Sequence, residues 1–590
     1  MSSARPRHRA TPVRRLPLAG ALRLNRPSDI WFKPALSVVV AVGVPNLTLL
    51  ALGRLDLALY SMAGSLCALY AHNLPYAARG RALARVVLGM LVSVAIALVT
   101  ASLTSSAVVL VAVGALLAAA HKAVTDLTRI GPPGPVIFTF ISSASLFAPQ
   151  TLGQVPGHLA LAAAAGAWAW LVGMAPGLVR PHGPERRATA RALNAAAAYV
   201  DAYAAVFPAG ERGERGERGE ESGPGHERAR AAAAAAVHAA WQSLLATGAR
   251  PGPRRALERL VVRAEVALAA PADTDPARLR TWARDLRGTH PVPRPEPGRD
   301  ADELLGVEVE LLAAGPAAGK SGKRRWTEGL GPLLPLALRT ALGCALAGYV
   351  SLALGVGRPY WALVTAASLY QANLTLTWSR GVQRVVGNLV GVLLFAAVAP
   401  LAHLGPAALV LCCLAFNFGA EALITRNYWL GSVCVTPMAL LISEFTGFQE
   451  PGGLITDRVV DTLVGAVVGF VAAVAVTNRR AGDRIEDALD TVERAREHAA
   501  RLIAAERPGS GPGSGSGSGP GPGPGALEAA RRRLAAALVE LRATTDAASG
   551  EWWQRALPQE RVMLAEQAGH RTLAATVRRQ GPHVLEDAEA

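Results

Sequence analysis

Two arginines beside a long apolar segment are the residues of this chain best suited to chemistry. Arg380, Arg384, Gly387 and Gly391 follow one another at steps of four, three and four residues, so all four share one face of a helix. A guanidinium at the edge of a low-dielectric region concentrates anions. An arginine at a helix start is also an ordinary topology signal in membrane proteins. The sequence leaves both interpretations open.

Aromatic and amide side chains near this arginine pair could line a path for a small molecule. An amide beside an apolar span costs free energy unless it is hydrogen-bonded, so Asn373 either joins two helices or lines such a path. The full set of path candidates, with the arginines, is Tyr360, Trp361, Tyr370, Gln371, Asn373, Arg380, Arg384 and Asn427.

The same pattern occurs about 300 residues earlier. Residues 69–89 read LYAHNLPYAARGRALARVVLG, and residues 369–391 read LYQANLTLTWSRGVQRVVGNLVG. Both copies end a second apolar run and begin a third, which predicts a parallel duplication of one membrane unit. The counterparts in the first copy are Tyr70, Asn73, Arg81 and Arg85.

Three carboxylates and four glycines complete the set of candidate residues. Glu421, Glu444 and Asp461 lie nearest to membrane depth, where each is either interfacial or part of a proton relay. Close glycine spacing favours helix packing in a bilayer and is compatible with a homodimer. The glycines in question are Gly387, Gly391, Gly465 and Gly469.

Several functions are excluded or disfavoured. The chain has no H-E-x-x-H or G-x-S-x-G motif, and AGPAAGKSG at 314–322 lacks the first glycine of a phosphate loop. The five cysteines lie inside apolar runs without metal-ligand spacing. We therefore expect no enzyme activity, no catalytic residue, no cofactor and no metal. Many arginines flank apolar runs, so orientation in a bilayer explains the formal charge of +16 better than nucleic-acid binding does.

Apolar and charged residues are segregated along the 590 residues, which is typical of a polytopic membrane protein. We predict an all-α chain with two six-helix membrane halves in parallel duplication. The predicted layout is a basic N-terminal tail at 1–33, a first membrane block at 34–180, a helical region with disordered linkers at 181–330, a second block at 331–478, and a helical hairpin with a Gly/Ser/Pro linker at 479–590. In the second block the expected spans are 332–356, 360–376, 385–402, 406–424, 428–446 and 459–477.

Arginine-rich segments before Trp31 and after Arg180 place both ends of the first block in the cytosol. The same alternation puts Arg380 and Arg384 in one cytosolic loop of the second block and Arg426 in another. Asp457, Arg458 and Asp461 do not fit this scheme, because they lead into the last span from the outer side.

The second block resembles the FUSC family of fusaric acid resistance proteins, which are related to the aromatic acid exporters. The resemblance rests on RPYWALVTAASLYQANLTLTWSRGVQRVVGNLVGVLL, on RNYWLGSVCVTPMALL and on RVVDTLVGAVVG. The residues of this chain that match the family pattern are Tyr360 and Trp361, Arg380 and Gly381, Arg384, Gly387 and Gly391, Asn427 and Tyr428, and Thr436 and Pro437.

The resemblance implies a multi-pass protein of the cell (inner or plasma) membrane, with cytosolic termini, that exports small, often aromatic, organic acids. Its expected partners are the lipid bilayer and small organic anions. An anion-permeable channel is an alternative. A third interpretation is a non-transporting scaffold whose cytosolic helices bind partners.

Overall fold

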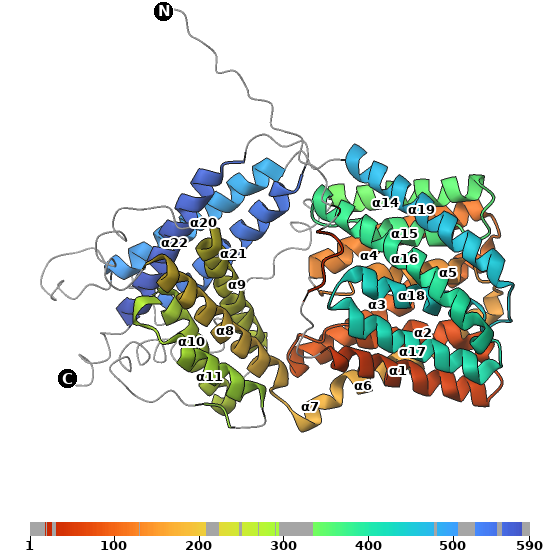
Figure 1. Ribbon diagram of the computed structural model, residues 1–590, viewed down its shortest axis with the longest axis horizontal. Coiled ribbons are helices and arrows are strands. Elements are labelled where there is room, and N and C mark those ends of the chain that lie inside the picture. The colour runs from red at the N-terminus through yellow and green to blue at the C-terminus, as the bar shows by residue number, and fades with distance from the viewer. Residues whose placement is uncertain are drawn as a thin grey trace, which may run out of the picture.

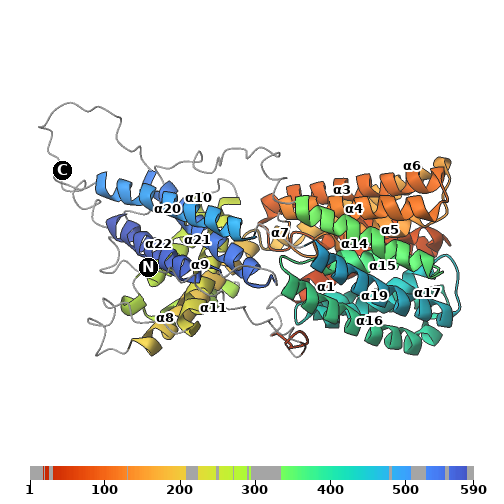
Figure 2. The same ribbon diagram turned by 90° about the horizontal axis from the view of Figure 1, so that it is seen from above.

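The chain forms a helical protein with a membrane part and an extramembrane part, which lie side by side in Figures 1 and 2. The structure is a computed structural model. It describes residues 18–580 except 19, 26–30, 129, 208–223, 247–250, 270, 289–290, 294–333, 477–480, 506–525 and 552–556. All regular elements within these residues are helices. The all-α prediction is confirmed.

Among the described residues, eight helices of the membrane part are long and apolar enough to cross a bilayer. In the first block they are α1 (Phe32–Ala51), α3 (Tyr76–Leu103), α4 (Ala107–Thr128) and α6 (Val155–Met174), the last of which follows a short turn η3 (Leu152–Gln154) and continues into α7 (Pro176–Val179). In the second block they are α14 (Leu334–Ala353), α16 (Leu374–Ala402), α17 (Pro406–Ile424) and α19 (Pro451–Ala475). The prediction of a polytopic membrane protein is confirmed.

Each block adds two shorter apolar helices at its second and fifth positions. These are η1 (Leu55–Leu57), α2 (Ala58–Ser65) and η2 (Leu66–Leu69) as one broken element, then α5 (Val136–Leu146), α15 (Tyr360–Leu369) and α18 (Tyr428–Ser443). A helix as short as α15 is about 15 Å long and cannot cross a ~30 Å hydrocarbon core alone. Nine of its ten residues are buried, so other helices surround it rather than lipid.

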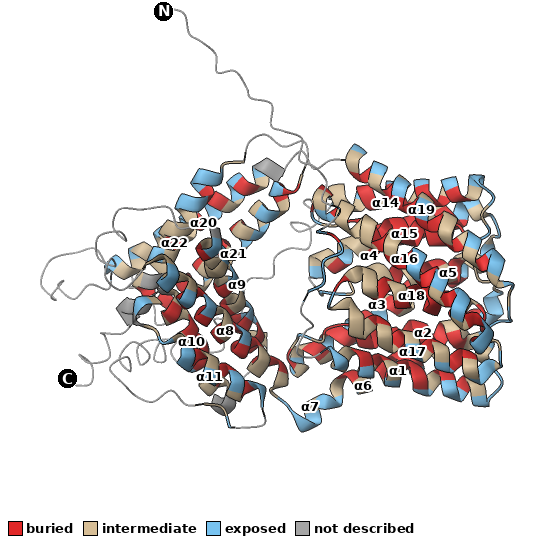
Figure 3. Ribbon diagram, viewed as in Figure 1, coloured by how far each residue is buried: buried red, intermediate tan, exposed pale blue. Residues whose placement is uncertain are grey.

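Helix packing is similar in the two blocks. The contacts α2–α6, α3–α6 and α3–α5 in the first block correspond by position to α15–α19, α16–α19 and α16–α18 in the second. The blocks also meet through matching helices, because α1 packs on α17 while α14 packs on α4. This correspondence is what a duplication of one unit would produce. The buried residues gather between these helices, in the interior of the membrane part (Figure 3).

Glycines allow the closest of these helix contacts. A Cβ atom on Gly387 would lie 2.5 Å from Ser432 Cβ, and one on Gly391 would lie 2.7 Å from Thr436 Cβ, both on α18. On α19, a Cβ on Gly465 would lie 2.4 Å from the Ala362 carbonyl oxygen. Gly469 is a little less crowded, with Ala366 on α15 at 3.1 Å. The four glycines thus lie where α16 meets α18 and where α19 meets α15.

Several helix limits differ from those expected from the sequence. The second span of the second block ends at Leu369 instead of 376, and the third begins at Leu374 instead of 385. Arg380 and Arg384 therefore lie within α16 and not in a loop. A helix of 29 residues is about 44 Å long, so its first turns extend beyond a ~30 Å hydrocarbon core or the helix tilts. The last span begins at Pro451 instead of 459, which brings Arg458 and Asp461 inside α19.

The extramembrane helices form two adjoining hydrophobic clusters. One comprises α8 (Gly183–Val206), α9 (Pro224–Ala246), α10 (Pro251–Ala269), the turn η4 (Pro271–Asp273) and α11 (Pro276–Arg287). The other comprises α20 (Ala481–Ala505), α21 (Ala526–Ser549) and α22 (Gln559–Gln580). The predicted hairpin corresponds to α20 and α21, which pack together, but α22 is a third helix that the hairpin prediction lacked. The segment 314–322 lies outside the described residues.

Charged side chains join these two clusters. Arg531 of α21 is 1% exposed and is paired with Glu265 of α10 and with Glu528, whose Oε2 lies 2.6 Å from its Nη2. Trp241 of α9 donates its indole N–H to Glu265 at 2.9 Å. A buried arginine with carboxylates on two helices fixes how those helices meet, because separating them would leave the charges unpaired.

Candidate functional site

The predicted arginine pair meets a tyrosine of the fifth helix. Arg384 is 3% exposed and donates an N–H from Nη1 to the Tyr428 hydroxyl at 3.1 Å. The guanidinium of Arg380 lies 4.0 Å from the centroid of the same ring, a cation–π contact. The short helix α18 begins at Tyr428, directly after its capping residue Asn427, and this cap positions the ring beside α16.

A second arginine group surrounds Trp361 at the start of α15. The guanidinium carbons of Arg458 and Arg358 are both 5.1 Å from the Trp361 ring centroid. Trp361 is 1% exposed and Arg458 is 2% exposed, whereas Arg358 is only half-buried and donates to Gln449 on the far side of the membrane part. Tyr360, the neighbouring candidate, is half-buried and packs edge-on against Trp361 at 5.7 Å.

The two groups form one series of positive charges across the membrane part. Arg384 and Arg458 are close enough to repel each other, and Tyr428 interacts with both. By position along their helices, Arg380, Arg384, Arg458 and Arg358 follow one another from the extramembrane side to the far side. We call these four residues the arginine series.

Neutral polar side chains and one carboxylate lie beside the arginine series. Ser351 of α14 donates to Oδ1 of Asp461 at 2.5 Å, while Oδ2 of this fully buried aspartate has no hydrogen-bond partner among the described residues. Asn388 of α16 donates to Thr462 at 3.0 Å and accepts from Thr436. A continuous polar network thus joins α16, α18 and α19 inside the apolar block.

The buried arginines have more hydrogen-bonding capacity than the protein uses. Among the described residues, Nε and Nη1 of Arg458 and Nε of Arg384 have no partner. A charged group at membrane depth is costly unless it is paired. Arg458 interacts with the carboxylate of Asp461 and also with a second cation, Arg384, so positive charge exceeds negative charge here and the site is electrostatically suited to a small anion.

The two candidate asparagines bind extramembrane segments instead of lining this series. Asn373 caps α16 by accepting from Leu376 N–H at 2.8 Å, and its amide donates to the Asp546 carbonyl of α21 at 3.4 Å. Asn427 caps α18 through Trp429 N–H at 3.3 Å and donates to carbonyl oxygens near the N-terminus. Both side chains therefore join the membrane part to the rest of the chain.

The remaining candidates near Asn373 lie on the extramembrane side, away from Trp361. Tyr370 is 2% exposed, and its hydroxyl lies against Gly343 without a hydrogen-bond partner among the described residues. Gln371 is half-buried and donates to the Tyr370 carbonyl at 3.3 Å. The structure thus separates these two residues from the Trp361 group.

The first block does not reproduce the arginine arrangement. Arg81 and Arg85 are exposed, and so is Asn73. Tyr70 is buried and donates to the Gly134 carbonyl at 2.7 Å. The buried arginine of this copy is Arg79, whose Nη2 lies 3.0 Å from Nδ1 of His72.

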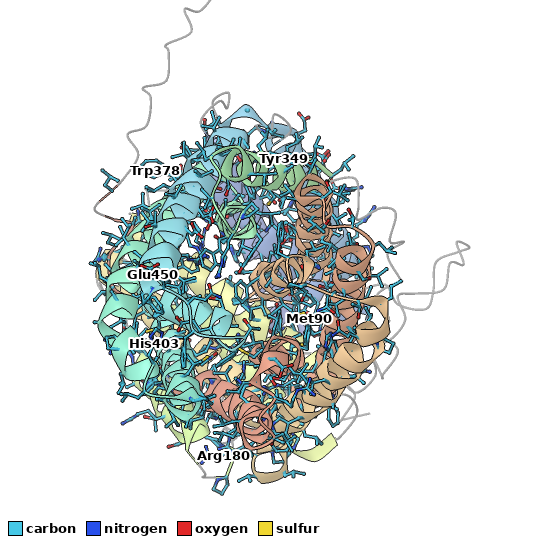
Figure 4. The ribbon with its side chains drawn as sticks, turned by 90° about the vertical axis from the view of Figure 1, so that its right-hand side faces the viewer. Met90, Arg180, Tyr349, Trp378, His403 and Glu450 are labelled. Atoms are coloured by element: carbon cyan, nitrogen blue, oxygen red, sulfur yellow. The ribbon has the colours of Figure 1, made fainter. Side chains whose placement is uncertain are left out.

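The other two candidate carboxylates lie at opposite ends of the second block. Glu444 is buried at the far end of α18, where Oε1 lies 3.1 Å from Nε2 of His403 and Oε2 has no partner among the described residues. Figure 4 looks along the membrane helices from this far end, with His403 and Glu450 on the second-block side and Met90 on the first-block side. Glu421 is half-buried near the other end, in the last turn of α17.

Sequence reasoning missed part of this site. From the sequence, Arg458 was noted only because it did not fit the alternation of inner and outer loops. Arg358, Ser351 and Asn388 were not predicted as site residues. A charged residue inside a run as apolar as 451–475 was the available signal. The polar partners have no sequence signal of this kind, because serine and asparagine are common at helix contacts.

The comparisons with known proteins agree with this site's position in the chain. Residues 345–472 match the family described as fusaric acid resistance protein-like. The second membrane block is FUSC-like. This confirms the resemblance found in the sequence motifs, and the FUSC-like block contains all four members of the arginine series. With the eight apolar helices among the described residues, the match supports a multi-pass membrane protein.

A relative without an assigned function shares most of the chain. The uncharacterized membrane protein YvaC of Bacillus subtilis (strain 168) is 24% identical over 509 residues, which cover 80% of this chain and 77% of that protein. This similarity extends well beyond the FUSC-like block. No solved structure matches the chain.

Proposed function

We propose that this protein is a secondary transporter that exports small organic anions, with aromatic acids as the preferred class. We place it in the cell membrane with both termini and the extramembrane helices in the cytosol, in line with the arginine-rich segments at that side. The family match supports transport but assigns neither the substrate nor the direction.

The observation that carries the proposal is the pair of buried arginines with unused N–H groups. Arg384 and Arg458 are each at most 3% exposed and lie in different helices of the FUSC-like block. A carboxylate between them would accept hydrogen bonds from both and would offset the repulsion between two buried cations. Removing the anion restores that repulsion, so the pair of arginines favours the anion-bound state.

The aromatic rings beside the arginines favour an aromatic acid over an aliphatic one. Trp361 and Tyr428 each present a ring within 5.1 Å of a guanidinium carbon. A flat substrate ring can pack on such a surface while its carboxylate meets the arginines. In the first block Arg79 is buried and lies 6.0 Å from the Tyr76 ring centroid, but no second buried arginine accompanies it among the described residues. We therefore assign the substrate site to the FUSC-like block.

Export assays with matched arginine variants test the proposal. Benzoate efflux from preloaded cells should fall about 10- to 100-fold in Arg384→Gln, the loss expected for one charge-assisted hydrogen bond to a buried anion. Arg85→Gln is the control, because Arg85 is its exposed counterpart in the first block. Arg85→Gln should export at the wild-type rate. If Arg384→Gln, inserted normally, also exports every acid of an aromatic and aliphatic panel at the wild-type rate, the proposed site is wrong.

A further inference from the structure

Basic side chains gather where the first membrane block joins the extramembrane helices. The chain passes there from α6 through α7 into α8, and α7 lies between the two parts in Figure 1. The side chains belong to Lys33 at the start of α1, Arg79 in the first turn of α3, Arg180 after α7 and Arg187 in the second turn of α8. The charge of Arg187 acts on each of the other three. We call these four residues the basic junction.

The basic junction is part of the packed structure and not a loose surface patch. Arg79 is 4% exposed, its Nη2 lies 3.0 Å from Nδ1 of His72, and its guanidinium carbon lies 6.0 Å from the Tyr76 ring centroid. Arg187 is half-buried and donates from Nε to the Gly183 carbonyl at 3.2 Å. An arginine that only orients a helix in the bilayer extends its charge into water. The burial of Arg79 therefore needs a further explanation.

The side chains of the junction have hydrogen-bonding capacity that the protein does not use. Nε of Arg79, Nη1 of Arg187 and Nε2 of His72 are buried and have no hydrogen-bond partner among the described residues. Glu185 is 1% exposed and supplies a negative charge beside Arg187, but the four cations exceed it. Buried N–H groups with an excess of positive charge suit an anion that accepts several hydrogen bonds, and a phosphate group is such an anion.

Exposed apolar side chains beside the junction indicate where that phosphate group comes from. Leu178 and Val179 of α7 are 90% and 82% exposed, and Trp31 and Phe32 at the start of α1 are each 39% exposed. Each pair directly precedes a member of the basic junction. Apolar side chains next to cations at the ends of membrane helices match the boundary between acyl chains and headgroups. Basic pockets between membrane helices bind lipid headgroups at this level.

We propose that the basic junction binds the phosphate group of an anionic lipid, such as phosphatidylglycerol, and that the bound headgroup holds α8 against the first membrane block. The phosphate accepts hydrogen bonds from Arg79 of α3 and Arg187 of α8 together, and it offsets the repulsion among the four cations. The arginine series lies in the other block, so this site does not depend on the proposed transport function.

Equilibrium binding of radiolabelled phosphatidylglycerol to the delipidated full-length protein in detergent tests the site. The wild-type protein should bind this lipid at least about tenfold more tightly than phosphatidylcholine. Arg79→Gln and Arg187→Gln should each weaken the binding about tenfold or more, the loss expected for one charge-assisted hydrogen bond. Arg81→Gln is the matched control, because Arg81 is exposed on the same helix as Arg79 and should leave the affinity unchanged.

Competition separates a lipid from a free anion. Glycerol phosphate and inorganic phosphate should not displace the labelled lipid at concentrations at which unlabelled phosphatidylglycerol does, because they lack acyl chains to pack beside Leu178 and Val179. Displacement by either compound at those concentrations overturns the lipid as the ligand. Equal affinity for the two lipids, or wild-type affinity in both Arg79→Gln and Arg187→Gln, overturns the site itself.

Hydrogen exchange in the unmodified protein tests the docking of α8 without any substitution. Peptides from residues 183–193 should exchange several-fold more slowly in nanodiscs that contain phosphatidylglycerol than in pure phosphatidylcholine, because the headgroup restrains the start of α8. Peptides from α20 serve as the internal control and should exchange equally in both lipids. Equal exchange of residues 183–193 in the two lipids overturns the docking role.

Discussion

Arg458 shows why the FUSC-like block carries a function and not only a fold. Its side chain is fully buried in α19, it lies over Trp361, and two of its nitrogens have no partner among the described residues. An apolar residue of similar volume at this position would be neutral or stabilising for folding. The anion that we propose as the substrate would pair with this cation.

His570 in α22 provides a residue-scale prediction for the extramembrane helices. Burial lowers the pKa of His570 to about 3, with a smaller contribution from the charge of Arg230 on α9. Below about pH 6.5 the unfolded chain binds a proton at this histidine and the folded chain does not. The free energy of unfolding is therefore highest above pH 6.5 and falls as the pH decreases towards 3. Hydrogen exchange in α22, corrected for the intrinsic rate, should therefore become faster from pH 6.8 to 5.5.

Two histidine variants test whether His570 causes this pH dependence. His570→Phe should weaken the pH dependence of exchange in α22, while His498→Phe on the partly exposed helix α20 should keep it. The neighbouring Glu566 has its pKa raised by burial, which would stabilise the folded state as the pH falls and so would act against the effect of His570. An unaltered pH dependence in His570→Phe would show that another group controls the opening.

Some site residues were accessible from sequence and others were not. Arg380 and Arg384 were found because their spacing puts them on one helix face with Gly387 and Gly391, and Trp361 was found through the family motif. The roles of Asn373 and Asn427 were not found, because a capping asparagine and a path-lining one look identical in sequence. Their partners, Asp546 and residues 21–23, are about 170 and 400 residues away.

At the scale of elements, the broken helices define the second block. The short α15 and α18 leave polar residues at their ends within reach of the long helix α16. An uninterrupted span from 360 to 376, as the hydropathy suggested, would extend α15 past Leu369 and remove the loop in which Asn373 caps α16. Hydropathy detects apolar length but not where backbone leaves the helix, which explains why this limit was misplaced.

Glycine replacement on α16 tests how closely α18 must approach. A Cβ on Gly387 would lie 2.6 Å from the Trp429 carbonyl oxygen as well as against Ser432, and backbone cannot move aside cheaply. Gly387→Ala should lower the stability of the protein by about 1–3 kcal/mol, the usual cost of overpacking, and should reduce the melting temperature in detergent.

Gly381 on the same helix is the control for that experiment. A Cβ there would have Leu369 Cδ2 as its nearest neighbour at 3.8 Å, an ordinary contact. Gly381→Ala should be neutral or raise stability by about 0.5–1 kcal/mol, because alanine favours a helix interior over glycine. Equal melting temperatures for the two variants would show that α16 and α18 are not held together by this approach.

At the scale of the whole molecule, the two membrane blocks are alike in packing and unlike in chemistry. Both residues 21–25 and the end of α21 bind the second block. At the end of α21, the Gly550 carbonyl accepts from the N–H and hydroxyl of Thr375 at 3.1 and 2.8 Å. The segregated composition and the repeat predicted the helical class and the two blocks. They could not predict which copy binds the extramembrane segments, because those contacts join residues far apart in the sequence.

Equilibrium binding of benzoate to the purified protein tests the central claim most directly, since it needs neither a driving force nor a transport direction. The wild-type protein should bind saturably, and Arg384→Gln and Arg458→Gln should each weaken binding about 10- to 100-fold, as expected for the loss of one charge-assisted contact. Arg85→Gln should bind as the wild type does. Wild-type affinity in both Arg384→Gln and Arg458→Gln would contradict an anion site at the buried arginines.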